Sequence, residues 1–178
     1  MRGVRATLPA SARAEKSRAI AAQLLGLPAL ATAKTAALFW PMEGRNEIDL
    51  RSADAALRER GVRVAYPKTD VDTGALAFHF VEHPAAMCAG ALGVCEPGER
   101  DPPVATDELD VIVVPALAVD PRGHRIGYGA GFYDRALARS SAVAVAVAFD
   151  FQLLVELPNT PEDVPVAFVV TESRTLAT

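Results

Sequence analysis

The sequence is poor in the residues that several common kinds of functional site require. Its 178 residues include 2 cysteines, 3 histidines and 1 tryptophan. Cys88 and Cys95 fit no zinc-binding spacing, so we expect free or partly buried thiols in a reducing cytoplasm. Apart from Glu82, which precedes His83, no carboxylate or cysteine stands beside a histidine in the sequence, which argues against a catalytic triad.

Long apolar runs and basic runs are also missing. No window reaches transmembrane length and the N-terminus has no signal-peptide core, so we predict a cytoplasmic protein without a membrane partner. The net charge of −4, with no extended basic run, argues against nucleic acid as the main partner. Apolar residues make up 51% of the chain, and 178 residues suit a single domain over 1–178, which we expect to be monomeric.

The spacing of apolar residues predicts alternating helices and strands. Ser11 is the expected N-cap of the first helix, and Asn46 or Asp49 that of the second, which ends at Gly61. Helices are predicted at 11–25, before Gly61 and at 132–139, with a helical turn at 153–157. Strands are predicted at 35–40, 62–66, 76–81, 111–114, 142–148 and 167–170. This alternation indicates an α/β fold: a three-layer sandwich with a mostly parallel sheet flanked by helices.

Three segments directly follow predicted strands. They are Pro41–Glu47, Pro115–Gly131 and Phe149–Gln152. Because ligands of such sheets bind beyond the carboxyl ends of the strands, we expect these segments to meet at one site. Residues 84–107, rich in Pro, Gly and Ala, form a long excursion of the kind that often serves as a lid or binding segment.

The glycine-rich loop after the central strand is the strongest functional signal. Gly127, Gly129 and Gly131 alternate with other residues, and glycine permits both positive φ and a close approach of the backbone to a ligand. If the following segment is helical, the amides of the loop and first turn converge where an anion would bind. Arg125 and Arg135 flank the loop with fixed positive charge suited to phosphate.

Other interpretations of this loop explain less. A merely flexible turn requires neither the flanking arginines nor the Tyr-Asp-Arg that follows. A P-loop requires Gly-Lys-Ser/Thr, which is absent, and the dinucleotide fingerprint requires a glycine where Phe132 stands. We therefore predict a distinct nucleotide-binding loop.

At these residues the sequence resembles the 5-formyltetrahydrofolate cyclo-ligase family, also called 5,10-methenyltetrahydrofolate synthetase. The family signature is Pro-Gly-Leu-Ala-Phe-Asp followed by Gly-x-Arg-x-Gly-x-Gly-x-Gly-Tyr-Tyr-Asp-Arg. The chain matches it as Pro115-Ala-Leu-Ala-Val-Asp120 and then Gly123-His-Arg-Ile-Gly-Tyr-Gly-Ala-Gly-Phe-Tyr-Asp-Arg135. A second similarity, to the family's closing motif, covers Glu162 to Glu172.

The resemblance implies an ATP- and Mg²⁺-dependent ligase that acts on 5-formyltetrahydrofolate. Asp134 would then bind the metal, and Arg125, Tyr133 and Arg135 are the expected catalytic residues. The expected ATP-binding residues are Arg125, Ile126, Gly127, Tyr128, Gly129, Ala130, Gly131, Phe132 and Tyr133. The expected folate-binding residues are Trp40, Glu47, Tyr128, Phe132 and Gln152.

The chain also departs from the family pattern. Ala167 replaces an aspartate that helps to bind metal in relatives, and Glu162 replaces a histidine. The sequence is expected to begin after the family's basic Lys-x-x-Leu-Arg segment, for which Arg2-Gly-Val-Arg5 is a poor substitute. These departures keep two alternatives open: a relative that binds ATP or folate without turnover, and one that acts on another substrate.

Overall fold

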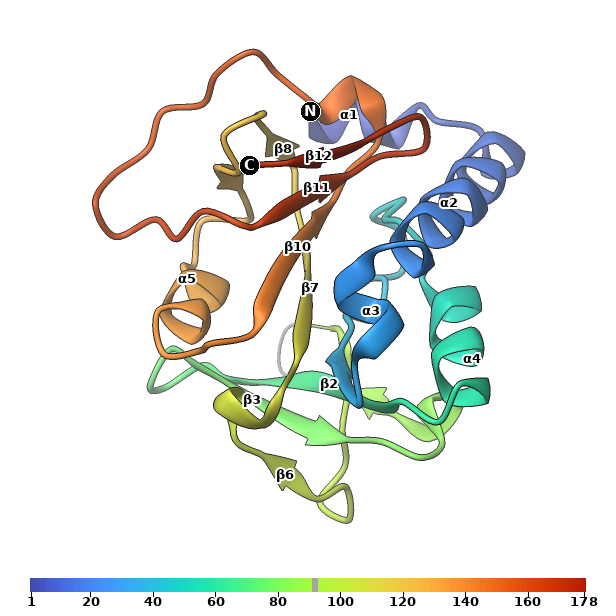
Figure 1. Ribbon diagram of the computed structural model, residues 1–178, viewed down its shortest axis with the longest axis vertical. Coiled ribbons are helices and arrows are strands. Elements are labelled where there is room, and N and C mark those ends of the chain that lie inside the picture. The colour runs from blue at the N-terminus through green and yellow to red at the C-terminus, as the bar shows by residue number, and fades with distance from the viewer. Residues whose placement is uncertain (91–92) are drawn as a thin grey trace.

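An eight-stranded sheet with helices on both faces forms the molecule (Figure 1). The computed structural model describes residues 1–90 and 93–178. The strand order is β12-β11-β10-β7-β1-β2-β3-β6, and the pairs from β11 through β10, β7 and β1 to β2 are parallel. The strands are β1 (Thr35–Ala37), β2 (Arg63–Asp70), β3 (Ala75–Phe80), β6 (Pro103–Val104), β7 (Val111–Pro115), β10 (Val143–Val147), β11 (Phe168–Val170) and β12 (Thr175–Ala177). The predicted α/β sandwich with a mostly parallel sheet is therefore confirmed.

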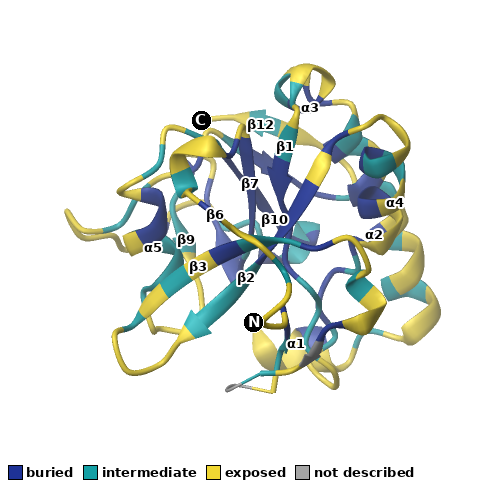
Figure 2. Ribbon diagram, turned by 90° about the horizontal axis from the view of Figure 1, so that it is seen from below, coloured by how far each residue is buried: buried dark blue, intermediate teal, exposed yellow. Residues whose placement is uncertain are grey.

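The central strands are buried on both faces because their side chains enter two separate cores. Along β7, Val111 and Val113 face one core while Ile112 and Val114 face the other. Along β10 the larger residues Val145 and Val147 share one face, and alanines occupy the opposite face. Figure 2 shows both strands in the colour of buried residues. This double burial explains why these strands read as continuous apolar runs.

Helices cover the two faces unequally. The helices α2 (Ala10–Leu25), α3 (Pro28–Thr32) and α4 (Arg51–Glu59) lie on one side, and α5 (Phe132–Leu137) lies on the other (Figure 1). The short α1 (Arg2–Ala6) precedes α2. The side chains of Ile20 and Leu24 from α2 and of Leu57 from α4 pack in the first core. Leu137 of α5 packs in the second core. Among the described residues, no helix combines the length and apolarity needed to cross a bilayer.

Several predicted boundaries are wrong for local reasons. Ser11 lies inside α2, whose N-cap is Pro9, and Asn46 caps no helix because its side chain donates to the carbonyls of Arg5 and Ala6. Pro67 does not close β2, which runs on to Asp70. Beyond Ala65, β2 pairs only with β3, and proline is tolerated in a strand that has one free edge.

Two elements near the C-terminus also differ from prediction. Residues 153–157 form no helical turn; a 3₁₀ turn instead spans Asp150–Gln152, directly after β10. The strand β11 is not the last, because β12 returns antiparallel to it at the sheet edge. The segment between β11 and β12 is too short for a crossover helix, so an antiparallel return follows naturally.

The excursion at 84–107 returns to the sheet. It contains a small ladder of β4 (Cys88–Ala89) with β5 (Cys95–Glu96), then β6, which pairs with β3. Short 3₁₀ turns span Pro84–Ala86 and Thr106–Glu108. Cys95 is a half-buried free thiol, as expected, whereas the prediction for the thiol of Cys88 lies outside the described side chains.

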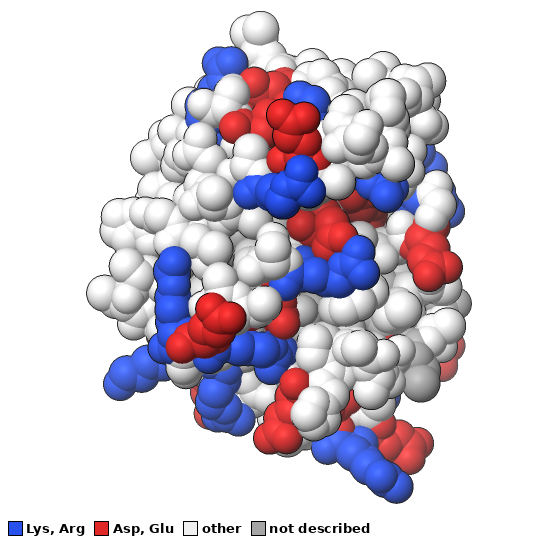
Figure 3. Space-filling model, turned by 90° about the vertical axis from the view of Figure 1, so that its right-hand side faces the viewer, with Lys and Arg blue, Asp and Glu red and all other residues white. Residues whose placement is uncertain are grey.

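The surface over α2 to α4 carries charges of both signs. On this face lysines and arginines are interspersed with aspartates and glutamates (Figure 3). Two of the contacts of α4 illustrate the pattern: Arg58 pairs with Asp54 at 2.9 Å, and Arg51 pairs with Asp49. Charge here is balanced locally, so this face does not offer a single-sign field to a polyanion.

Candidate functional site

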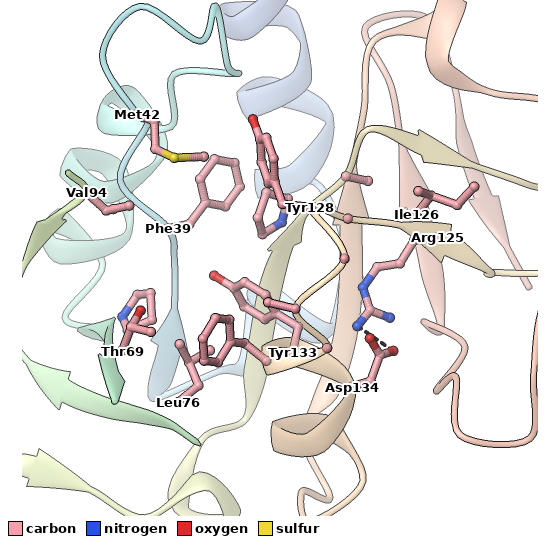
Figure 4. Close-up of a pocket in the computed structure, with 18 of the residues that line it drawn as sticks. Phe39, Met42, Thr69, Leu76, Val94, Arg125, Ile126, Tyr128, Tyr133 and Asp134 are labelled. Carbon is pink, nitrogen blue, oxygen red and sulfur yellow. Dashed lines mark hydrogen bonds and ion pairs between the residues drawn. The ribbon is translucent and has the colours of Figure 1, made fainter. Parts of the chain in front are cut away.

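A cavity of about 540 Å³ opens at the carboxyl ends of β1, β2 and β7. Trp40 and Glu47 contribute from the loop after β1, Pro115 and Ala116 from the end of β7, and residues 125–134 from the glycine-rich loop and α5. Figure 4 shows Phe39 and Met42 on one side of this cavity and the glycine loop on the other. Two of the three segments predicted to converge therefore do so. The cavity has the size of a typical small-molecule site.

The glycine-rich loop follows a hairpin of β8 (Ala118–Val119) and β9 (Arg125–Ile126). Gly129 and Gly131 adopt φ values of +94° and +66°, which side chains disfavour, and Gly131 is the N-cap of α5. The backbone N–H groups of residues 127–131 donate no hydrogen bond to any residue that the structure describes. The loop is exposed at the cavity and presents a row of unused donors there.

Arg125 is the buried cation beside this loop. Its guanidinium donates to Asp134 Oδ1 at 2.9 Å and to the Val164 carbonyl at 2.8 Å, and its side chain is only 4% exposed. Figure 4 shows the Arg125–Asp134 pair at the edge of the cavity. Two acceptors fix the plane of the guanidinium, so its orientation is set before any ligand arrives.

Arg135 occupies a different environment. It is exposed, and its guanidinium donates to the backbone carbonyls of Gly74 and Ala130. Gly74 lies at the tip of the β2–β3 hairpin, so Arg135 joins this hairpin to the glycine loop. In this structure Arg135 does not line the cavity, unlike Arg125.

A partly buried cluster of Arg5, Tyr128 and Glu47 connects the glycine loop to the loop after β1. The Tyr128 hydroxyl donates to Glu47 Oε1 at 2.8 Å and accepts a hydrogen bond from Arg5. Arg5 lies 3.6 Å from the same carboxylate oxygen, and Met42 N donates to Glu47 Oε2 at 2.9 Å. The cluster fixes Glu47 at the cavity wall, because a nearby cation and two hydrogen-bond donors hold its carboxylate in one position.

Aromatic side chains supply the apolar part of the site. Trp40, Tyr128, Phe132 and Tyr133 all line the cavity. Trp40 is steadied by an edge-on contact with Tyr66, with ring centroids 5.8 Å apart. Tyr133 and Leu76 both line the cavity, and both are drawn at the lower end of the close-up in Figure 4. A flat heterocyclic ligand would find both apolar faces and hydrogen-bonding groups here.

Gln152 lies outside this cavity. It is 1% exposed, donates to the carbonyls of Ala116 and Leu117, and accepts from Phe149 N. These hydrogen bonds hold the backbone of Ala116 and Leu117 in place. Gln152 therefore supports the cavity wall from outside the cavity. The end of the family-like closing motif is also structural: Glu172 accepts from Asp150 N at 2.8 Å and pairs with Lys16.

Asp134 and Asp163 are the two aspartates that line the cavity, and Ala167 does not line it. Asp134 uses Oδ1 to accept from Arg125 and from Val164 N, and Oδ2 takes no hydrogen bond from a described residue. No group of three or more His, Cys, Asp or Glu among the described residues is arranged to hold a metal ion. One free carboxylate oxygen fits Mg²⁺ that arrives on phosphates, since this ion keeps several waters and takes few protein ligands.

All 3 tyrosines of the chain have raised pKa values. Burial raises the pKa of Tyr66 and the negative charge of Asp54 adds to it; burial and then Glu47 do the same for Tyr128 and Tyr133. Because each phenol ionises at higher pH in the folded than in the unfolded chain, the resulting stability is complete below about pH 10 and is lost as the pH rises through the folded pKa.

We therefore expect ionisation of the two tyrosines with the largest pKa shifts, Tyr66 and Tyr133, to coincide with alkaline unfolding. Tyrosinate absorbance and far-ultraviolet circular dichroism, followed together as the pH rises above about 10, should change in one cooperative step. The urea-unfolded chain serves as the control and should titrate gradually around pH 10. Gradual ionisation of the folded protein with unchanged circular dichroism would contradict the burial of these phenols.

Sequence reasoning missed several residues at or beside the cavity, among them Arg5, Glu96 and Asp163. Arg5 was set aside with the N-terminal residues, Glu96 lay in a stretch without periodicity, and Asp163 lay in the closing motif. A weak signal existed only for Asp163, which follows the Glu162 substitution. Arg5 and Glu96 reach the site through long-range packing of α1 and β5, which local patterns do not encode.

Comparison with known proteins agrees with the signature of the loop. The family model described as the 5-formyltetrahydrofolate cyclo-ligase family matches residues 1–172. A 5-formyltetrahydrofolate cyclo-ligase of Mycolicibacterium smegmatis is 35% identical over 176 residues, covering 96% of this chain and 89% of the relative. A protein of the same name from Escherichia coli K12 is 31% identical over 166 residues, covering 90% of each chain.

Solved structures show the same fold. The NMR structure of Aquifex aeolicus 5,10-methenyltetrahydrofolate synthetase superposes with a TM-score of 0.84 at 32% identity, covering 98% of this chain and 87% of that one. A 5,10-methenyltetrahydrofolate synthetase from Mycoplasma pneumoniae shares the fold with a TM-score of 0.77 at 21% identity, covering 96% and 93% of the two chains. The chain belongs to the 5-formyltetrahydrofolate cyclo-ligase family.

Proposed function

We propose that this protein uses ATP to convert 5-formyltetrahydrofolate to 5,10-methenyltetrahydrofolate. The observation that carries the proposal is the exposed glycine loop beside the fixed guanidinium of Arg125 at the cavity. The loop amides at 127–131 donate to none of the residues described, 1–90 and 93–178. Such a loop suits a triphosphate, and the aromatic cavity next to it suits a reduced pterin. Membership of the cyclo-ligase family favours turnover over the alternative of binding alone.

The reaction consists of a phosphoryl transfer and a ring closure. The formyl oxygen attacks the γ-phosphorus and ADP leaves, which gives a phosphorylated iminium at N5. The N10 lone pair then attacks the formyl carbon, N10 releases its proton, and the bond from carbon to the phosphate oxygen breaks. The products are 5,10-methenyltetrahydrofolate, ADP and phosphate.

The side chains of the site suit the first step because phosphoryl transfer depends mainly on positioning and charge neutralisation. The loop amides and Arg125 would bind the phosphate oxygens, and the free oxygen of Asp134 would hold Mg²⁺. Bound Mg²⁺ would neutralise phosphate charge. Arg135 would assist only after leaving the Gly74 carbonyl, which it now contacts at 2.6 Å.

The apolar residues suit the second step. Tyr128, Phe132 and Tyr133 would pack against the folate ring and exclude water, which would otherwise hydrolyse a reactive iminium. Trp40 would extend the apolar wall, and Glu47 would accept a hydrogen bond from the ring. A cytoplasmic location and a monomeric state stay predictions from the sequence.

The test is an assay of the purified protein with 5-formyltetrahydrofolate and Mg·ATP. We expect the near-ultraviolet absorbance of methenyltetrahydrofolate to appear with ATP and not with a non-hydrolysable ATP analogue. Released phosphate should equal the methenyl product in amount. Folded protein that binds ATP but forms no product would refute the proposal.

A further inference from the structure

The cavity contains a second buried carboxylate besides Glu47. Glu96, on β5, is 6% exposed and lines the cavity. It comes from the excursion at 84–107, which the sequence marked only as a lid or binding segment. Its neighbours Thr69 and Val94 lie on the wall opposite Arg125 and Ile126 in Figure 4. Glu96 thus faces the ligand space from the side opposite the glycine loop.

The two carboxylates differ in the hydrogen bonds and positive charges that neighbouring residues offer them. Glu47 accepts from Met42 N and Tyr128 and lies near the cation of Arg5. Glu96 accepts one hydrogen bond, from Thr69 N to Oε1 at 3.1 Å. No Lys, Arg or His in the described part of the chain forms an ion pair with it, and Oε2 takes no hydrogen bond there. A carboxylate this buried favours ligand groups that donate hydrogen bonds.

The backbone fixes the position of this carboxylate. Thr69 N holds one oxygen, and the other lies against the backbone of Gly90, where an added Cβ would come within 2.0 Å of Oε2. A side chain at position 90 would push Glu96 out of place. The acceptor is therefore set in advance, as expected of a group that orients a ligand.

We propose that Glu96 binds the reduced folate by accepting hydrogen bonds from its ring N–H groups. This assignment depends on the proposed function. A triphosphate would be repelled by an unpaired carboxylate, whereas a tetrahydropterin carries N–H donors on its edges. Glu47 and Glu96 would hold the ring from two sides, with the formyl group left facing the nucleotide.

The test replaces Glu96 with glutamine, which preserves shape and still offers an oxygen to Thr69 N. We expect the KM for 5-formyltetrahydrofolate, and its Kd measured by calorimetry without ATP, to rise about 10- to 100-fold, because an amide N–H then faces the N–H donors of the ring. The KM for ATP should stay within about twofold and the Tm within about 2 °C of the original protein. Glu99→Gln, an exposed change on the same excursion, is the matched control and should alter neither constant.

A purely structural role predicts a different pattern. If Glu96 only braces Thr69, Glu96→Ala should lower the Tm while Glu96→Gln keeps the original Kd for 5-formyltetrahydrofolate, and the proposal would be overturned. Equal weakening of ATP and folate binding by Glu96→Gln would also overturn it. Failure of the original protein to turn over would refute the proposed function instead, so the two failures are distinguishable.

Discussion

Replacing Arg125 with methionine is expected to lower kcat by about 10²- to 10³-fold. Methionine keeps an apolar stem of similar length but removes the fixed charge that would stabilise the transferring phosphoryl group. The guanidinium now donates to Asp134 and to the Val164 carbonyl, so Arg125→Lys should rescue only part of the activity, since an ammonium cannot reproduce this planar geometry. The measurement is the rate of methenyltetrahydrofolate formation at saturating ATP and folate.

Folding must be separated from catalysis in this variant. Asp134 is 28% exposed at its side chain, so water can solvate it once its partner is gone, and we expect a modest fall in Tm. Arg139→Met, an exposed change just after α5, is the control and should retain the original kcat. A kcat for Arg125→Met within about threefold of the original would remove Arg125 from the proposed chemistry.

The second prediction compares substitutions at Gly127 and Gly123, because a side chain would have free space at Gly127 and would clash with the backbone at Gly123. An added Cβ at Gly127 would meet no protein atom within 4 Å, and its φ lies outside the left-handed region. Gly127→Val should therefore fold normally, yet its side chain would occupy the surface on which phosphates are proposed to lie. We expect the KM for ATP to rise by at least about 10-fold with little change in Tm.

Gly123 is the contrasting case. Its φ is +87° and an added Cβ would lie 2.4 Å from the Val166 carbonyl, so Gly123→Ala should destabilise the fold by roughly 2 kcal/mol or more. Thermal unfolding and ATP titration of both variants distinguish the two roles. Normal ATP binding by folded Gly127→Val would show that phosphates do not lie on this loop.

The central strands were predictable because burial on both faces requires a continuous run of apolar residues in the local sequence. Val111 to Val114 enter two cores in alternation, and a continuous apolar run is the expected consequence. The glycine loop was predictable for the same local reason, since Gly129 and Gly131 adopt φ values that glycine favours. Membership of the family was predicted from this loop and is confirmed by the match over residues 1–172.

The remaining features depend on partners far away in the chain. Pro67 continues β2 because the neighbouring strand β1 ends at Ala37, opposite Ala65, which leaves one edge of β2 free; this depends on topology and not on local pattern. Arg5 reaches Tyr128, 123 residues away, and Glu96 reaches Thr69 only after the excursion has folded back. Gln152 was assigned to the folate from its match to a family position, whereas in the structure its amide donates to two backbone carbonyls.

The contact between Arg125 and Val164 has a consequence for synthesis on the ribosome. The acceptor that orients the guanidinium is made 39 residues after the arginine itself, and Gly123 also pairs with Val166 N. A nascent chain whose glycine loop has just been synthesised therefore still lacks Val164 and Val166, which hold Arg125 and Gly123 in position. Nucleotide affinity should emerge late in translation, and stalled chains ending before Val164 should bind ATP weakly.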